Sequence, residues 1–248
     1  MDWASLIGII LALAGILLGH GLEGGKLASL VQPAAFAIVF IGTAGAVLLQ
    51  NDSATFRRGV GMLRWVFAPP ESRRARLARE IENWSSYARR DGLLSLEQFM
   101  ESNDDRFIKK GLRLVVDGIA PDKIRSILET EVTAYEFSQR QGARVWEAAA
   151  GYAPTIGIIG AVLGLINVME NLAEPAKLGA GIAVAFVSTV YGVGLANLFF
   201  HPVGAKLKAI IAERVTQYDI LTDVFFDIAS GDHARVVEER VQSLLSRA

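Results

Sequence analysis

The sequence predicts an all-α membrane protein with four transmembrane helices in two hairpins and a large helical cytoplasmic insert between spans 2 and 3. Residues 3–22, 27–50, 148–169 and 178–205 contain no Asp, Glu, Lys or Arg. About 20 apolar residues are enough for a helix to cross a bilayer, and a helix satisfies its own backbone hydrogen bonds there. The stretch between the two pairs, 51–147, carries 17 Lys/Arg and 15 Asp/Glu. No alternating pattern typical of a β-strand stands out.

The basic residues predict the orientation of the hairpins. Of the 25 Lys/Arg, 17 lie in 51–147 and 6 follow residue 205, which leaves only Lys26 and Lys177 in the turns between paired spans. Because Lys and Arg near span ends mark the cytoplasmic side, we expect the N-terminus, the insert and the C-terminus to be cytoplasmic. The leader Met1-Asp2-Trp3 has no basic residue, so we expect a retained first helix and not a cleaved signal peptide.

Four segments follow from this pattern. The first is a transmembrane hairpin at 1–50, with spans at about 3–22 and 27–50, and the second is a cytoplasmic helical domain at 51–147. The third is a hairpin at 148–205, with spans at about 148–169 and 178–200, and the fourth is a cytoplasmic helical tail at 206–248. The tail is predicted to hold two further helices, separated by a turn at Ser230–His233.

The insert is predicted to be a series of helices. After the breaker Ala68-Pro69-Pro70, a helix over Glu71–Arg89 carries Leu77, Ile81 and Trp84 on one face. Gly92 ends it, a short helix resumes over Leu93–Met100, and Asp104 or Asp105 is expected to cap a helix over Arg106–Val116. A last helix begins at Pro121 and runs through Arg144 toward the third span, with an apolar stripe of Ile124, Ile127, Leu128, Val132 and Tyr135.

Composition disfavours several classes of site. The net charge of −1 gives no reason to expect nucleic acid or a strongly acidic partner. The chain has no Cys, and His20, His201 and His233 are scattered, so we expect no disulfide framework and no metal site. No constellation of nucleophile, base and acid is evident, so we expect neither an enzyme nor a cofactor.

The densest motif is YAPTIGIIGAVLGL at Tyr152–Leu165. Gly157, Gly160 and Gly164 recur on one helical face, where small residues let another helix approach closely. A phosphate-binding glycine loop is a poor alternative, because such a loop follows a strand in a soluble setting. Pro154 stands near the cytoplasmic end of the span, where it either starts or kinks the helix, the commoner role, or serves as a hinge.

The fourth span carries a second face of small and hydroxyl residues. Thr189, Gly192 and Ala196 share this face, with Ser188 and Tyr191 nearby. A single Thr in a membrane helix usually bonds to the carbonyl four residues earlier. Beside the glycine face of span three, the pattern is also consistent with a narrow wet path or a seat for another helix.

None of the four spans contains a carboxylate, Lys or Arg. Ion pathways in membranes normally use such an ionisable group. If this chain moves ions, a partner chain must therefore supply the carboxylate.

Opposite charges flank the predicted break at Asp91-Gly92, with Arg89 and Arg90 before it and Glu97 after it. Exposed pairs stabilise a fold by only about 0–1 kcal/mol. Charges presented in this way are usually a solvated helix end, and otherwise they serve recognition.

These features together resemble the MotA branch of the MotA/TolQ/ExbB proton-channel superfamily, the stator subunits of the flagellar motor. The resemblance covers nearly the whole chain. It is carried by Gln32-Pro33 followed by FIGTAGAVLL, ARRDGLLSLE from Ala88, ILETEV from Ile127, the YAPTIGIIGAVLGL block, STVYGVGLAN to HPVGAKL, and GDHARVVEERVQSLL from Gly231. The span-three block is shared with the wider superfamily, whereas the two-plus-two layout and the stretch from Ala88 favour the motor branch.

The resemblance implies a homo-oligomeric ring of five such chains around two MotB-like chains in the bacterial inner membrane. Each MotB-like chain contributes one span with an Asp and a domain that binds peptidoglycan, and ion flux through the complex produces torque on the rotor. Pro154 and Pro202 match the two motor prolines of the family, and Thr189 matches a hydroxyl that faces the ion path. Ala161 stands where sodium-driven relatives usually carry Thr, so the transported ion is expected to be H+.

Two sets of candidate residues follow from the resemblance and the motifs. The residues of the ion pathway and of partner-helix packing are Pro154, Gly157, Gly160, Ala161, Gly164, Thr189 and Pro202. Arg89, Arg90 and Glu97 match the charges that meet the rotor protein FliG.

Two other interpretations remain. A TolQ/ExbB-like energiser of an outer-membrane process has three spans and an external N-terminus, whereas this sequence predicts four spans and internal ends. A structural membrane scaffold would not need the small-residue face at Gly157, Gly160, Gly164 and Thr189. A bulky residue at Gly160 would abolish ion-driven function in a transducer and would have a mild effect in a scaffold.

Overall fold

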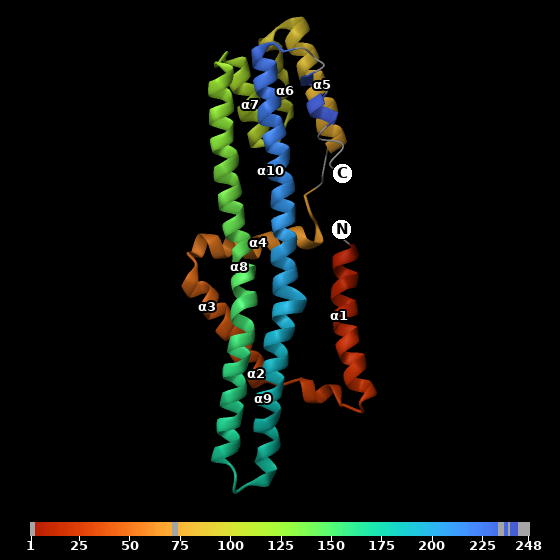
Figure 1. Ribbon diagram of the computed structural model, residues 1–248, viewed down its shortest axis with the longest axis vertical. Helices are drawn as coiled ribbons and strands as arrows, with labels where there is room; N and C mark the ends of the chain where they lie inside the picture. The colour runs from red at the N-terminus through yellow and green to blue at the C-terminus, as the bar shows by residue number, and fades with distance from the viewer. Residues whose placement is uncertain (1–2, 71–73, 233–235, 238, 243–248) are drawn as a thin grey trace. The chain divides into compact units, whose positions relative to one another are not determined.

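The computed structural model describes residues 3–70, 74–232, 236–237 and 239–242, and every regular element in that part of the chain is a helix (Figure 1). The helices form two compact units. The membrane unit comprises Met1–Pro69 and Gln139–Ile210, and the polar unit comprises Pro70–Ser138 and Ile211–Ala248. Among the residues described, four helical stretches are long and apolar enough to cross a membrane, which confirms the predicted fold class.

The first span is the single helix α1 (Trp3–Leu22), whereas the second is divided. Leu27–Leu30 forms the short 3-10 helix η1, and the continuous helix begins only at Pro33. Gln32 between them is extended, with φ −123° and ψ 99°, because a residue that precedes proline is disfavoured in the helical region. The candidate span is Leu27–Gln50, as expected, but its continuous helix begins only at Pro33. From Pro33 the span runs through α2 (Pro33–Phe36), the π-helical η2 (Ala37–Ile41) and α3 (Gly42–Gln50).

The third span belongs to the longest helix of the protein. Helix α8 (Pro121–Glu170) has 50 residues and continues through Pro154 without ending there. The prediction of a helix that runs from Pro121 into span three is confirmed. Pro154 therefore does not start the helix. It lies inside a helix that begins at Pro121.

The fourth span likewise continues beyond the membrane. Helix α9 (Pro175–Leu195), the π-helical stretch η4 (Ala196–Phe200) and α10 (His201–Ser230) follow one another without a turn. The prediction of a separate tail helix from Leu207 was wrong. Pro202 does not break the helix: it is the second residue of α10, close behind a π-helical stretch, a local rearrangement that helices tolerate. Much of the second predicted tail helix, including 233–235, 238 and 243–248, lies outside the described residues.

In the membrane unit, helix α4 (Ser53–Phe67) crosses α8 directly after the second span (Figure 1). Asp52 caps it, since its carboxylate accepts from the backbone N–H groups of Ala54 and Thr55 at 3.0 and 3.1 Å. The Trp146 indole Nε1 of α8 donates to the Gly59 carbonyl at 2.8 Å. The cap and this bond fix where α4 starts and how it lies against α8.

The polar unit has its own apolar core. It consists of α5 (Arg74–Asp91), η3 (Leu93–Leu96), α6 (Glu97–Ser102), α7 (Arg106–Val116) and parts of α8 and α10. Trp84 stacks on Phe225 with ring centroids 5.8 Å apart, and both side chains are almost wholly buried. The predicted face of Leu77, Ile81 and Trp84 is buried as expected, as are Ile124, Leu128 and Val132 of the stripe on α8. Ile127 is the exception, since 37% of it is exposed.

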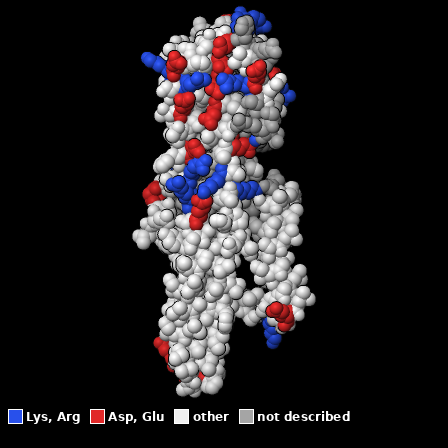
Figure 2. Space-filling model, viewed as in Figure 1, with Lys and Arg blue, Asp and Glu red and all other residues white. Residues whose placement is uncertain are grey.

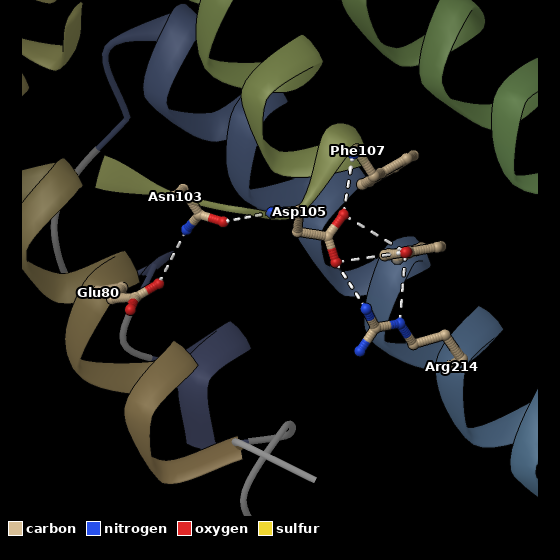
Figure 3. A network of polar contacts seen from close by, with 6 residues as sticks. Glu80, Asn103, Asp105, Phe107 and Arg214 are labelled. Carbon is tan, nitrogen blue, oxygen red and sulfur yellow. Dashed lines mark hydrogen bonds and ion pairs between the residues drawn. The ribbon is translucent and has the colours of Figure 1, made fainter. Parts of the chain in front are cut away.

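One carboxylate joins two helices of the polar unit, α7 and α10 (Figure 3). Asp105 caps α7 by accepting from the Phe107 N–H at 2.9 Å, which confirms one of the two predicted caps. It also accepts from the Arg214 guanidinium of α10 at 2.6 Å and from the Tyr218 hydroxyl at 3.3 Å. Burial raises the pKa of Tyr218 to about 12, so its hydroxyl remains protonated and donates at every physiological pH. Asn103 extends the network by donating to Glu80 of α5 at 3.3 Å.

The surfaces of the two units differ in the number of charged side chains that they carry. On the face shown in Figure 2, Lys, Arg, Asp and Glu side chains cover the polar unit, whereas the surface of α8 and α9 beyond α4 is almost free of them. Large apolar side chains are exposed there instead, including Ile158 at 57% and Phe186 at 72%. Such a surface is expected where lipid or another helix covers it.

We expect Asp105→Ala to destabilise the polar unit by about 2–4 kcal/mol, because it removes a helix cap and leaves a half-buried guanidinium and hydroxyl without their acceptor. The measurement is the thermal unfolding midpoint of the full chain in detergent. Asp104→Ala is the matched control, since Asp104 is the exposed neighbour. Equal midpoints in the two variants would show that the network does not stabilise the unit.

Candidate functional site

The candidate site is the contact between α8 and α9, which lie side by side in the membrane unit (Figure 1). Gly157, Gly160 and Gly164 of α8 are all buried. A Cβ atom on Gly157 would lie 2.8 Å from the Ser188 carbonyl oxygen, and one on Gly164 would lie 2.6 Å from the Ala185 nitrogen. Both distances are shorter than real Cβ contacts. The backbones of the two spans are therefore in direct contact, as the glycine spacing predicted.

Helix α9 contributes matching small residues. A Cβ atom on Gly192 would lie 2.5 Å from the Ala153 carbonyl oxygen and 3.2 Å from the Cα of Pro154. A Cβ atom on Gly181 would lie 2.7 Å from the Val168 side chain. Sequence reasoning singled out Gly192 but missed Gly181 and Ala185. The signal was present, because small residues recur on α9 at 181, 185, 188 and 192 with helical spacing.

Two hydroxyl groups lie at this contact. Ser188 is fully buried. A Cβ atom on Gly160 would lie 2.7 Å from the Cβ of Ser188 and 2.7 Å from the Oγ of Ser188. The Ser188 hydroxyl donates to the Val184 carbonyl at 2.7 Å, and the Thr189 hydroxyl donates to the Ala185 carbonyl at 3.3 Å. Both donors are thus used within the helix, as is usual for hydroxyls in membrane helices. The oxygen lone pairs still leave each group able to accept a hydrogen bond.

A third hydroxyl, on the second span, was missed by sequence reasoning. Thr43 of α3 is 2% exposed, and its Oγ1 is the buried side-chain atom that lacks a hydrogen-bond partner among the residues described. The adjacent Gly42 faces α8, since a Cβ atom there would lie 2.9 Å from Ile156. A single Thr among small and apolar residues gives no signal in a sequence, because its burial depends on the packing of separate spans.

The remaining predicted residues of the pathway are dispersed. Pro154 is half-buried inside α8, and the absence of its N–H leaves the Ala150 carbonyl without the usual donor four residues on. Ala161 is half-buried on the same helix, and Pro202 is exposed near the start of α10. The structure therefore brings Pro154, Gly157 and Thr189 to one contact of α8 with α9, whereas Pro202 belongs to α10.

The charged rim, Arg89, Arg90 and Glu97, lies at the junction of α5 with η3 and α6. All three side chains are exposed. The chain reverses there at Gly92, whose φ of 84° lies in a region that favours glycine. The predicted break is confirmed, and it presents the three charges to solvent.

Local contacts orient the two arginines of the rim. Arg90 pairs with Asp91 at 2.9 Å, and the hydrogen bond from Arg90 lowers the pKa of that carboxyl. Arg89 donates to the Asp232 carbonyl. Between the charges stands Leu94, which is 72% exposed and which sequence reasoning missed. An exposed leucine among charges is consistent with a protein-binding surface, although single exposed apolar residues are common.

The arrangement supports close helix packing. Within the described ranges, no group of three or more His, Asp or Glu side chains is placed to hold a metal ion. The α8–α9 contact is a neutral wall of glycine, backbone and hydroxyl groups, at which Pro154 and Thr189 remain half-buried.

Comparisons with known protein families agree with this geometry. Residues 100–220 match the family described as the MotA/TolQ/ExbB proton channel family, and residues 6–81 match the motility protein A N-terminal family. Motility protein A of Bacillus subtilis is 34% identical over 244 residues, covering 97% of this chain and 90% of the relative.

Solved structures are similar over the same length. A chain from the structure of C. jejuni MotAB superposes with a TM-score of 0.92 at 29% identity, covering 98% of this chain and 96% of that one. A chain from the structure of the flagellar MotAB stator complex from Bacillus subtilis superposes with a TM-score of 0.87 at 33% identity, and both chains are covered completely.

We expect Gly164→Ala to force α8 and α9 apart, because its new Cβ would meet backbone atoms that cannot move aside. Overpacking of this kind costs about 1–3 kcal/mol. Gly151→Ala is the matched control on α8, since nothing lies within 4 Å of its added Cβ, and replacing helical Gly by Ala is favourable by about 1 kcal/mol. The measurement is the thermal midpoint in detergent. A Gly164→Ala variant as stable as Gly151→Ala would contradict the close contact.

Proposed function

This chain belongs to the motility protein A family, within the MotA/TolQ/ExbB proton channel family, and on that premise we propose that it is a stator subunit of a bacterial flagellar motor. In this function it conducts ions together with a MotB-like partner and converts the ion flux into torque on the rotor. Both similar structures are of MotAB complexes, which supports such a partner for this chain.

The observation that carries the proposal is the neutral contact of α8 with α9. Its backbones meet through Gly157, Gly164 and Gly192, and neither charge-free stretch that contains them holds Asp, Glu, Lys or Arg. An ion step in such a place requires a carboxylate from outside the chain. We propose that the single span of the MotB-like partner supplies an Asp beside Pro154 and Thr189.

The proposed mechanism follows from the cost of charge in hydrocarbon. Protonation neutralises the partner's Asp, which changes its preferred contact with the wall of small residues. Each elementary charge that crosses the membrane releases about 2.3 kcal/mol per 100 mV, enough to favour one packing arrangement over another. Because α8 continues from Pro154 back to Pro121 without a break, a change at the wall acts on a helix that also belongs to the polar unit.

The finer features of the proposal concern assembly and orientation. The chain forms a ring of five around two MotB-like subunits in the inner membrane, with its N- and C-termini in the cytoplasm. The transported ion is H+, for which Ala161 is the supporting residue. The rim of Arg89, Arg90 and Glu97, together with the exposed Leu94, contacts FliG. A TolQ/ExbB-like energiser fits less well, since four candidate spans are present instead of three.

We expect this chain, expressed with the single-span partner encoded beside it, to restore swimming to a bacterium that lacks its own stator genes. A protonophore should stop the swimming, and replacing sodium by potassium should leave the speed unchanged. Gly160→Leu should abolish swimming while the chain still reaches the membrane, whereas Gly151→Ala should not. Swimming that required sodium would refute H+ as the ion, and no rescue would count against the stator function.

Charge reversal at the rim tests the rotor contact separately. We expect Arg90→Glu combined with Glu97→Lys to reduce swimming speed severely without changing the amount of chain in the membrane, because all of the affected charge is exposed. Swimming speed in soft agar and single-cell torque are the measurements. Arg113→Glu is a matched control, since Arg113 is exposed on α7 away from the junction of α5 and α6. Unchanged torque in the double variant would remove these residues from the rotor contact.

A further inference from the structure

Helix α4 has three faces, and the one that is fully buried packs against α8. Gly59, Met62 and Val66 are buried. A Cβ atom on Gly59 would lie 2.7 Å from the Gly142 carbonyl oxygen, and one on Gly142 would lie 2.7 Å from the Met62 sulfur. This contact with α8 fixes which way the other two faces of α4 point.

The second face is apolar and only partly covered. Phe56, Val60, Leu63 and Phe67 recur at intervals of three and four residues, so they form one stripe along the helix. Val60 is 45% exposed, and the other three are half-buried. An apolar stripe that the chain does not cover needs another apolar surface.

The third face is basic and lies next to that stripe. Arg57 and Arg64 are seven residues apart, which places them about 20° apart around a helix. Both are exposed. Among the described residues, the Arg57 side chain reaches only the Ser53 carbonyl, at 3.4 Å, and the Arg64 side chain has no hydrogen-bond or ion-pair partner. The two guanidinium groups are thus available to an external anion.

The position of α4 along the chain places it at the membrane border. It begins three residues after Gln50, the last residue of the second span, and three residues of chain extend at most about 11 Å. Its contacts on α8 are with Gly142, Val145 and Trp146, directly before the charge-free stretch that starts at residue 148. Two separate spans therefore leave the membrane at the level of this helix.

The surroundings of α4 in the membrane unit are strongly basic. Residues 51–69, 139–147 and 201–210 together hold seven Lys/Arg and two Asp/Glu. Both acids are occupied, since Asp52 caps α4 and Glu147 pairs with Lys208. Figure 2 shows Lys and Arg side chains gathered at the level of α4, where the uncharged surface of the spans begins. Local acids therefore do not neutralise Arg57 and Arg64.

We propose that α4 lies in the interfacial layer of the bilayer and that Arg57 and Arg64 bind the phosphate headgroups of anionic phospholipids. The apolar stripe would be inserted among the acyl chains, as in other amphipathic interfacial helices. The arginine stems would lie along the apolar boundary while their guanidinium groups extend to the headgroups. This binding does not depend on the stator function proposed above.

An acidic protein surface is the other occupant that two arginines could accept. The lipid fits better, because the apolar stripe adjoins the arginines on the same helix and continues the exposed apolar surface of the spans. A protein partner at this place would have to cover the stripe at the depth of the membrane border.

The test is a lipid titration of the full chain purified in detergent, followed by native mass spectrometry. The probes are phosphatidylglycerol, which is anionic, and phosphatidylcholine, which has no net charge. We expect Arg57→Gln with Arg64→Gln to weaken the first phosphatidylglycerol binding step by about fivefold for each arginine, since a basic residue near an anionic surface contributes about 1 kcal/mol. Binding of phosphatidylcholine should be unchanged.

Two further variants make the outcome decisive. Arg79→Gln with Arg113→Gln removes the same charge from exposed positions of the polar unit, and we expect it to keep the affinity for phosphatidylglycerol. Arg57→Lys with Arg64→Lys keeps the charge, so it should retain most of the affinity and exclude misfolding as the cause. Equal losses in both Gln double variants would refute the site. Loss of swimming with unchanged lipid affinity would assign the two arginines to an acidic protein instead.

Discussion

The backbone contact between α8 and α9 is the constraint on which the rest of the membrane unit depends. Within hydrocarbon there is no hydrophobic force between helices, so two spans associate through close van der Waals packing. Here Gly157 and Gly164 meet the backbone at Ser188 and Ala185, and Gly192 meets the backbone at Ala153. The three glycine positions lack room for any side chain, and their neighbours in the contact are small, which explains why no charged group stands there.

Because the contact is neutral, ion handling and force transmission are separated. A buried carboxylate between α8 and α9 would cost several kcal/mol unless it found a partner. Leaving the wall without charge allows a second chain to bring the carboxylate and to move relative to the wall. The same helices then continue out of the membrane, since α8 extends to Pro121 and α10 to Ser230, and their ends pack in the core around Trp84 and Phe225.

The sequence predicted what depends on local pattern and missed what depends on distant contacts. The spans, the face with Trp84, the Asp105 cap and the break at Gly92 follow from hydrophobic periodicity or from one residue's conformational preference. The role of Asp105 in joining α7 to Arg214 could not be predicted, because 109 residues separate the two side chains. The burial of Thr43 and the exposure of Ile127 likewise depend on how separate helices pack. The helix that continues through Pro202 was missed because proline ordinarily ends a helix and the π-helical stretch before it has no clear signature.

The basic residues around α4 limit how the α8–α9 contact can move relative to the membrane. Gly59 and Gly142 let α4 and α8 approach closely, with Val145 and Met62 packed against them. A tilt of α8 at this level must therefore carry α4 with it or break the Trp146 bond to Gly59. A helix held in the headgroup layer by Arg57 and Arg64 resists movement along the membrane normal, where its arginines would enter hydrocarbon, more than rotation within the plane. If α4 is held in this way, motion that starts at the α8–α9 contact turns around the membrane normal and not along it, which is the direction that the proposed production of torque requires.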